Sequence, residues 1–235
     1  MQTTIYKPED EQELMATLWT PAIADDPEAF VLFAFPWGQE NTPLQHFKGP
    51  RKWQREVLRE IAAHIKRQQG RIDFETLRHA VSSGRGIGKS ALVSWLTIWM
   101  LSTRIGSTTI ISANSEAQLR AVTWAEITKW LAMSINSHWF EVAATKITPA
   151  NWLTELVEKD LKKGTRYWAV EGRLWSAENP DAYAGVHNFD GVMVIFAMAP
   201  PIGFLISKIS ICASVVKVKD PLPPLLVSLP CNLTE

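Results

Sequence analysis

The feature that most constrains the fold of this chain is the segment Ser83-Gly84-Arg85-Gly86-Ile87-Gly88-Lys89-Ser90. Its second half, Gly-Lys-Ser, has the spacing of a phosphate-binding P-loop, although the first position of the usual pattern is Ser83 and not glycine. In such a loop backbone N–H groups surround the phosphates, and glycines let the backbone approach them closely. Lys89 would then reach the β- and γ-phosphates, and the Ser90 hydroxyl would hold Mg²⁺.

The residues on either side favour this interpretation. Residues 77–82 alternate in a way that predicts a short strand, and residues 89–101 are almost wholly apolar and free of Gly and Pro, which predicts a buried helix. A strand, a glycine-rich turn and a helix form the context of a P-loop, and the helix adds the positive end of its dipole. The alternative is an ordinary glycine-rich turn that binds nothing.

Strands are expected to alternate with helices along the rest of the chain. Residues 107–112, 166–170 and 191–196 are strand candidates, the last being an apolar run of the kind buried in a parallel sheet. A helix capped near Ser115 is expected to run to about Met133. The expected fold class is therefore α/β: a P-loop NTPase-type, mainly parallel sheet flanked by helices and incomplete at the C-terminus.

An amphipathic helix is predicted over residues 50–69, where apolar residues recur at helical spacing. Its polar side is basic and carries Arg51, Lys52, Arg55, Arg59, Lys66 and Arg67. Two interpretations stay open. The face is either simply solvated, as most charge runs are, or it contacts the phosphates of a ligand or of DNA.

Composition narrows the class of protein. The 235 residues carry 24 basic and 24 acidic side chains, so a globally basic nucleic-acid binder is not indicated. The two cysteines, Cys212 and Cys231, suggest neither a disulfide scaffold nor a metal cluster.

The acidic N-terminus is unlike a signal peptide, and a cytoplasmic protein is expected. All eleven tryptophans lie between Trp19 and Trp175, so the last sixty residues differ in character.

Several short segments stand in a particular order: Pro36-Trp37-Gly38 with Pro43-Leu44, Trp53-Gln54-Arg55-Glu56, Gly84-Arg85-Gly86-Ile87-Gly88-Lys89-Ser90, Ser112-Ala113-Asn114-Ser115, and Ala182-Tyr183-Ala184-Gly185-Val186-His187. In this order and spacing they resemble the ATPase half of a bacteriophage terminase large subunit, the motor that packages DNA into proheads. The resemblance spans roughly residues 20–196. Order and spacing carry it more than any one segment does.

The resemblance implies an ATP- and Mg²⁺-dependent motor in the cytoplasm of a bacterial host. Its partners would be double-stranded DNA, a terminase small subunit and a portal, and it would form a homo-oligomer with no membrane partner. Gln54 would contact adenine, and the nucleotide would be bound by Ser83, Gly84, Arg85, Gly86, Ile87, Gly88, Lys89 and Ser90. Arg85 would act in cis on the γ-phosphate, as an arginine finger does. The alternative for Arg85 is a surface arginine that faces solvent.

The chain departs from this family after residue 196. There the acidic strand should end in Asp-Glu, but Ala197 and Met198 follow, and neither can hold a metal shell or accept a proton. General-base assistance alone is typically about 10²–10⁴-fold in rate, so hydrolysis should be very weak. The family's coupling motif and nuclease domain do not follow in this sequence, which suggests a gene interrupted by a frameshift or recombination. A continuation containing Asp-Glu in a neighbouring reading frame would support that hypothesis.

Three parts are therefore expected: an N-terminal lead segment over residues 1–49, a partial P-loop ATPase domain over 50–196, and an aberrant apolar, Pro-rich tail over 197–235. The tail is expected to be mobile or weakly packed, although β-branched residues within 202–218 favour strand pairing. A competing interpretation is a membrane segment, since residues 191–207 carry no charged side chain, but Pro200-Pro201 interrupts the stretch.

The function expected from sequence is thus an ATP-binding fragment of the DNA-packaging motor with little or no hydrolysis. One alternative is a non-enzymatic prophage remnant or passive interaction module. Another is a different P-loop ATPase such as a helicase, which would show helicase motifs after residue 198; none is visible.

Overall fold

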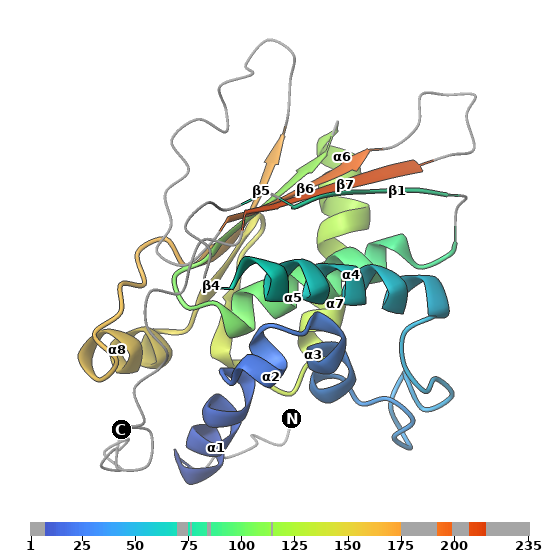
Figure 1. Cartoon of the computed structure of the whole chain (residues 1–235). Helices are drawn as coiled ribbons and strands as arrows, with labels where there is room; N and C mark the ends of the chain where they lie inside the picture. Colours follow the sequence, from blue (N-terminus) through green and yellow to red (C-terminus); the bar gives the residue numbers. More distant parts are fainter. Residues whose placement is uncertain are drawn as a thin grey trace.

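A seven-stranded sheet forms the centre of the computed structural model, which describes residues 8–69, 75, 77–83, 86–113, 115–174, 192–198 and 207–214. The strands lie in the spatial order β1-β7-β6-β2-β5-β4-β3. Their bounds are β1 Leu77–Ser83, β2 Thr108–Ala113, β3 Phe140–Val142, β4 Lys146–Pro149, β5 Ala169–Leu174, β6 Val192–Met198 and β7 Ser207–Ser214. Figure 1 shows the helices α3, α4, α5 and α7 gathered on one face of this sheet.

Strand directions make the sheet mixed. β2 pairs in parallel with β5 and with β6, whereas β7 runs antiparallel between β1 and β6. Because two antiparallel steps restore the direction, β1, β6, β2 and β5 all point the same way. The hairpin of β3 and β4 adds antiparallel pairings at the other edge. The α/β class is confirmed, but the sheet holds more antiparallel pairing than the sequence predicted.

Helices account for most of the remaining described residues. The first four are α1 Pro8–Leu18, α2 Pro21–Ala24, α3 Pro27–Ala34 and α4 Lys52–Gln68, and the long central helix is α5 Lys89–Thr103. After β2 the chain continues through α6 Glu116–Gln118, the π-helix η1 Leu119–Trp124 and α7 Ala125–Met133. A 3₁₀ turn, η2 Ser137–Trp139, and α8 Asn151–Lys159 complete the set.

Local sequence explains several helix boundaries. The carboxylate of Asp26 accepts hydrogen bonds from the backbone N–H groups of Glu28 and Ala29, and Pro27 opens α3. The Ser115 hydroxyl likewise accepts from the N–H of Gln118, as expected for the cap of the helix that follows β2. Both helices therefore begin where a short polar side chain can satisfy N–H groups that have no partner inside the helix.

The C-terminal end of α5 is buried and is capped by side chains from distant parts of the chain. The last carbonyls of a helix have no partner inside it, and leaving them unpaired in a core is costly. The indole N–H of Trp19 donates to the Ser102 carbonyl at 3.0 Å, and that of Trp168 donates to the Leu101 carbonyl at 2.8 Å. Tryptophan suits these positions because it fills apolar volume and still carries a donor.

A second aromatic group packs the other side of the core. The rings of Trp95 and Trp130 meet edge to face at 5.1 Å between centroids, and Phe35 and Trp37 pack against Trp130 at 5.2 Å and 5.9 Å. These residues come from the turn after α3, from α5 and from α7. The high tryptophan content is thus explained by a shared core that joins these elements.

The N-terminal segment belongs to this same core. Leu18 and Phe30 are fully buried in the cluster that contains α5. The carboxylate of Glu11 accepts from the indole N–H of Trp139 at 2.7 Å, and Arg104 donates to the Ala24 carbonyl at 2.9 Å. The predicted lead segment 1–49 is therefore, where described, packed together with α5.

Strand β7 lies inside the predicted tail. It falls within the stretch 202–218 for which pairing was expected, and it pairs with β1 from Leu77 to Ser83 and with β6 from Val192 to Met198. The predicted boundary at residue 196 thus passes through β6 and separates two paired strands. Within the described residues, no helix combines the length and apolar character that a membrane crossing requires.

Candidate functional site

The predicted P-loop segment connects β1 to α5. β1 ends at Ser83 and α5 begins at Lys89, as the sequence predicted. Gly86 and Gly88 both have positive φ angles, of 74° and 93°, a backbone conformation that favours glycine. Gly84 and Arg85 lie outside the described residues, so the predicted role of Arg85 stays a prediction. The two glycines let the described part of the loop turn between β1 and α5 in a left-handed conformation.

Lys89 is the first residue of α5 and is only 7% exposed. Burial lowers the pKa of its ammonium group, because desolvation penalises the charged form. Ser90 follows and is partly exposed, and its carbonyl accepts a hydrogen bond from the Ser94 hydroxyl at 2.9 Å. A buried cation at the positive end of a fifteen-residue helix is a site that an anion would stabilise.

Gln54 lies beside this loop, and its amide is engaged by the backbone. Its Nε2 donates to the Gly88 carbonyl at 2.8 Å, and its Oε1 accepts from the N–H of Arg51 at 2.8 Å. The side chain is 2% exposed. Gln54 therefore lies against the start of α5, where the sequence predicted a nucleotide site, and its contact with adenine stays a prediction.

Strand β6, the predicted acidic strand, ends level with β1. The register places Ala197 opposite Ala113 of β2 on one side and opposite Ile209 of β7 on the other, and Ile209 pairs with Val81 of β1. One strand thus separates β6 from β1. At a strand spacing of about 4.8 Å, their backbones lie roughly 10 Å apart at this level.

The carboxyl ends of β1, β6 and β2 meet at one edge of the sheet because these strands share a direction. The P-loop turn follows β1 at this edge, and the cap residue Ser115 follows β2. In open α/β sheets, ligands bind outside the carboxyl ends of the strands. The arrangement therefore brings the predicted site residues to the expected edge.

The basic side of α4 is in part structural. Arg55 and Arg59 both donate to the carboxylate of Glu28 in α3, through their Nε atoms at 2.5 Å. Burial raises the pKa of Glu28, but the hydrogen bonds from Arg59 and Arg55 outweigh it and hold this pKa below its ordinary value. These two arginines therefore tie α4 to α3, which neither interpretation from sequence anticipated.

A magnesium ion would find one protein ligand at the loop, the Ser90 hydroxyl at the start of α5. No group of three or more acidic, His or Cys side chains that could hold a metal is found among the described residues. Mg²⁺ commonly keeps several waters and binds through substrate phosphates, so a single hydroxyl beside a bound triphosphate fits this ion. The residues present fit Mg²⁺ carried in with a nucleotide.

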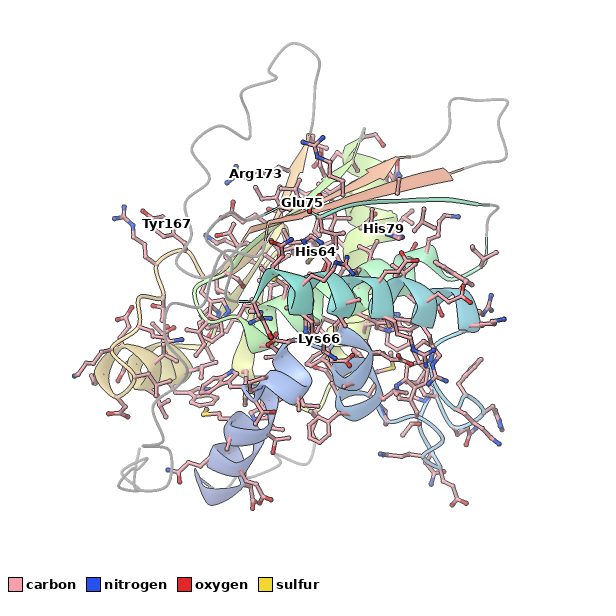
Figure 2. All side chains as sticks on the ribbon, in the orientation of Figure 1. His64, Lys66, Glu75, His79, Tyr167 and Arg173 are labelled. Atoms are coloured by element: carbon pink, nitrogen blue, oxygen red, sulfur yellow. The ribbon has the colours of Figure 1, made fainter. Side chains whose placement is uncertain are left out.

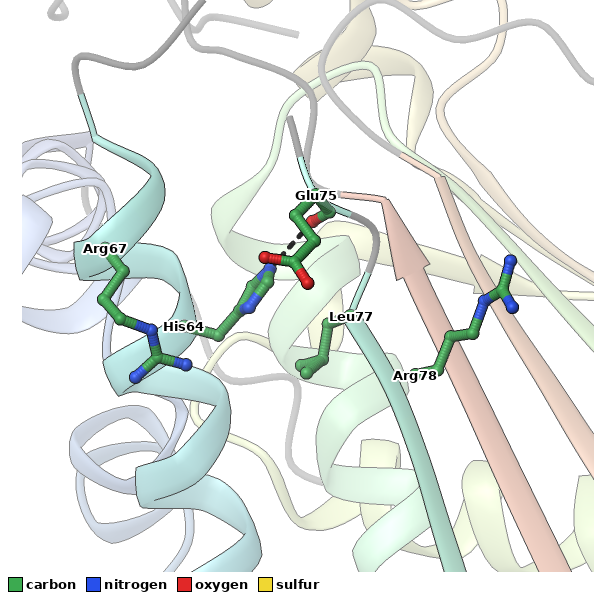
Figure 3. Close-up of a pocket in the computed structure, with 5 residues that line it drawn as sticks. All are labelled: His64, Arg67, Glu75, Leu77 and Arg78. Atoms are coloured by element: carbon green, nitrogen blue, oxygen red, sulfur yellow. Dashed lines mark hydrogen bonds between the residues drawn. The ribbon is translucent and has the colours of Figure 1, made fainter. Parts of the chain in front are cut away.

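A cavity of about 610 Å³ lies elsewhere, between the C-terminal half of α4 and the start of β1. Figure 3 shows its lining residues: His64, Arg67, Glu75, Leu77 and Arg78. The His64 ring is hydrogen-bonded to the Glu75 carbonyl at 2.9 Å. The Arg78 guanidinium points away from His64 and Glu75 (Figure 3). The cavity lies at the opposite end of β1 from the P-loop, so it is not the predicted nucleotide site.

Sequence reasoning did not single out the histidine contacts around α4 and β1. Figure 2 shows His64 and His79 around α4 and β1, whereas Tyr167 and Arg173 belong to the β5 side. His79 lies 3.3 Å from the carboxylate of Glu60 in α4. A histidine on a strand facing a helical glutamate gives no distinctive sequence pattern.

Comparison with protein-family models, with curated proteins and with solved structures found no match to this chain.

Proposed function

We propose that this chain is the ATP-binding part of a phage terminase large subunit. The observation that carries the proposal is the junction of β1 and α5, where two glycines with positive φ are followed by a buried lysine at the first position of a long helix. Backbone N–H groups, a helix dipole and a cation converge there, which is the chemistry that binds the phosphates of a nucleotide.

In this proposal each residue of the loop has a defined task. Residues 83–88 supply backbone N–H groups, Lys89 contacts the β- and γ-phosphates, and Ser90 holds Mg²⁺. Arg85 stabilises charge on the γ-phosphate. Double-stranded DNA, the small subunit and the portal would be the partners, and the protein would act as a homo-oligomer in the cytoplasm of a bacterial host.

ATP turnover should be near background. Ala197 and Met198 stand where a metal-organising Asp and a catalytic Glu belong. The double change Ala197→Asp with Met198→Glu should restore little, because the family's coupling motif does not follow Met198 in this sequence. Robust phosphate release by the unmodified chain would refute the proposal that it is catalytically impaired.

A second candidate, a non-enzymatic interaction module, is favoured by one observation. β7 occupies the position between the P-loop strand and the predicted acidic strand, and it pairs along the whole of both. A protein that only presents a surface needs no more than this continuous sheet, and it needs no carboxylate at Ala197 or Met198.

Nucleotide titration separates the two candidates. We expect ATP with Mg²⁺ to bind, and Lys89→Ala to weaken binding about 10- to 100-fold, because a charge-assisted hydrogen bond contributes roughly 1.5–3 kcal/mol. The matched control is Lys159→Ala, since Lys159 is 73% exposed and pairs with Glu155 on α8. Equal ATP affinity for the unmodified chain and Lys89→Ala would show that the P-loop assignment is wrong.

A further inference from the structure

We propose that Gln54 is a positioning residue for the phosphate-binding loop, and that it fixes the first turn of α5 instead of reading the base of the nucleotide. The proposal rests on the function proposed above and deepens it. It concerns how the loop is held in a binding-competent shape before any ligand arrives.

The first support is the pair of hydrogen bonds that Gln54 makes. Its Oε1 accepts from the N–H of Arg51 at the start of α4, and its Nε2 donates to the carbonyl of Gly88 at the start of α5. A single planar amide thus connects the N-terminal ends of two helices. The Gly88 carbonyl also accepts the N–H of Leu92 at 3.2 Å, the first hydrogen bond of α5.

The second support is the close approach at Gly88. A Cβ atom placed on Gly88 would lie 2.8 Å from Nε2 of Gln54, closer than such atoms come in real structures. Glycine at this position therefore serves two purposes: it adopts the positive φ of 93°, and it lets the amide of Gln54 reach the backbone.

The third support is the burial of Gln54. With 2% of its surface exposed, the side chain offers almost nothing for a purine to contact. Its helix is held in turn by Val57 and Leu58 in the core and by the contacts of Arg55 with Glu28. A rigid support of this kind keeps loop N–H groups oriented, and such pre-organisation lowers the cost of binding.

The test compares two buried glutamines on the same helix. Gln54→Leu removes both hydrogen bonds at similar volume and without a change of charge. Gln68→Leu is the matched control, because Gln68 is 6% exposed and accepts from the Glu75 N–H at the other end of α4. Affinities are measured for ATP, GTP and inorganic tripolyphosphate, each with Mg²⁺.

Gln54→Leu should weaken all three ligands by the same factor, roughly threefold to tenfold for the loss of a hydrogen bond of ordinary strength. Gln68→Leu should leave the three affinities unchanged. A loss confined to ATP would instead make Gln54 an adenine-contacting residue and overturn the proposal. Equal losses for both variants would assign the effect to general damage and overturn it as well.

Amide hydrogen exchange without ligand gives a readout that does not depend on nucleotide binding. Gln54→Leu should speed exchange in the first turn of α5, at residues such as Leu92, relative to Gln68→Leu. If the unmodified chain binds none of the three ligands, the proposed function fails, and this comparison still decides the role of Gln54. Equal protection of that turn in both variants would overturn the proposal.

Discussion

Glu28 of α3 receives the guanidinium groups of Arg55 and Arg59, one turn apart on α4, through contacts of 2.5 Å. The carboxylate is nearly buried, whereas both arginines remain substantially exposed. Because α4 also carries Gln54, this contact fixes the helix that lies against the P-loop. Glu28 thus helps to position α4, and with it Gln54, against the start of α5.

Replacing Glu28 with Gln should therefore lower stability. We expect a loss of about 1–2 kcal/mol, below the full value for charged hydrogen bonds because solvent screens the exposed partners. Glu155→Gln, in a largely exposed pair with Lys159, should cost less than about 0.5 kcal/mol. Chemical denaturation of both variants measures this, and equal costs would show that the Glu28 contact has no special weight.

The pH dependence of the Glu28 contribution follows from the direction of its pKa shift. The pKa is lower in the folded state than in the unfolded chain, where it is about 4.3. The contribution is thus complete above that unfolded value and is lost as pH falls through the folded value. The difference in stability between the unmodified chain and Glu28→Gln should shrink below about pH 4.

The two left-handed glycines of the loop should respond differently to alanine. A Cβ on Gly86 would meet nothing within 4 Å, so Gly86→Ala costs only the strained backbone, about 1 kcal/mol. Gly88→Ala carries the same strain and also displaces the Gln54 amide. Thermal unfolding should therefore show a larger loss for Gly88→Ala.

A double-mutant cycle tests the origin of that difference. In a Gln54→Ala background the space beside residue 88 is open, so the extra cost of Gly88→Ala over Gly86→Ala should disappear. Additive effects would mean that Gln54 and Gly88 do not interact energetically.

The elements around the P-loop were predictable because each has a local signature. Residues 77–82 and 89–101 match β1 and α5, and the amphipathic stretch 50–69 matches α4. The roles of Gln54 and Glu28 were not predictable, because each depends on a partner from another element: Gly88 is 34 positions from Gln54, and Arg59 is 31 positions from Glu28. Periodicity identifies a buried face but not the partner that meets it.

The position of β7 in the sheet could not be predicted from the sequence either, because its neighbours are distant along the chain. The β-branched residues in 202–218 indicate a strand, but nothing local selects β1 and β6 as its neighbours or sets an antiparallel direction. Strand order depends on contacts between distant segments. Four strands (β1, β6, β2 and β5) share a direction, as alternating strands and helices suggested, and β7 and the β3–β4 hairpin make the sheet mixed.

Lys89 should make the stability of the ligand-free protein depend on pH. Burial lowers its pKa in the folded state, so between this value and the ordinary value near 10.4 the unfolded chain binds more protons than the folded one. Stability contributed by this site therefore rises with pH across that window, and the cost is complete below the folded pKa. Lys89→Met should remove this dependence, as the difference between two denaturation series would show.

Bound tripolyphosphate should reduce the same effect. An anion beside Lys89 favours the charged ammonium and raises its pKa. With saturating ligand, the pH-dependent difference between the unmodified chain and Lys89→Met should become smaller or change sign. An unchanged difference would indicate that the anion does not bind next to Lys89.

The last prediction concerns β7, which supplies the ladder partners of both β1 and β6. Two shortened chains isolate its contribution. A chain that ends after Ser214 keeps every described pairing of β7, and it should unfold cooperatively with nearly the stability of the full chain. A chain that ends after Ile206 leaves β1 and β6 each with an unpaired edge, a geometry that favours aggregation. It should lose cooperative unfolding and expose β1, the strand that leads into the predicted P-loop.

Limited proteolysis gives an independent measurement, because β1 should be cleaved much faster in the shorter chain. If both chains resist proteolysis and denaturant equally, β7 does not stabilise the sheet, and the tail is dispensable for the fold.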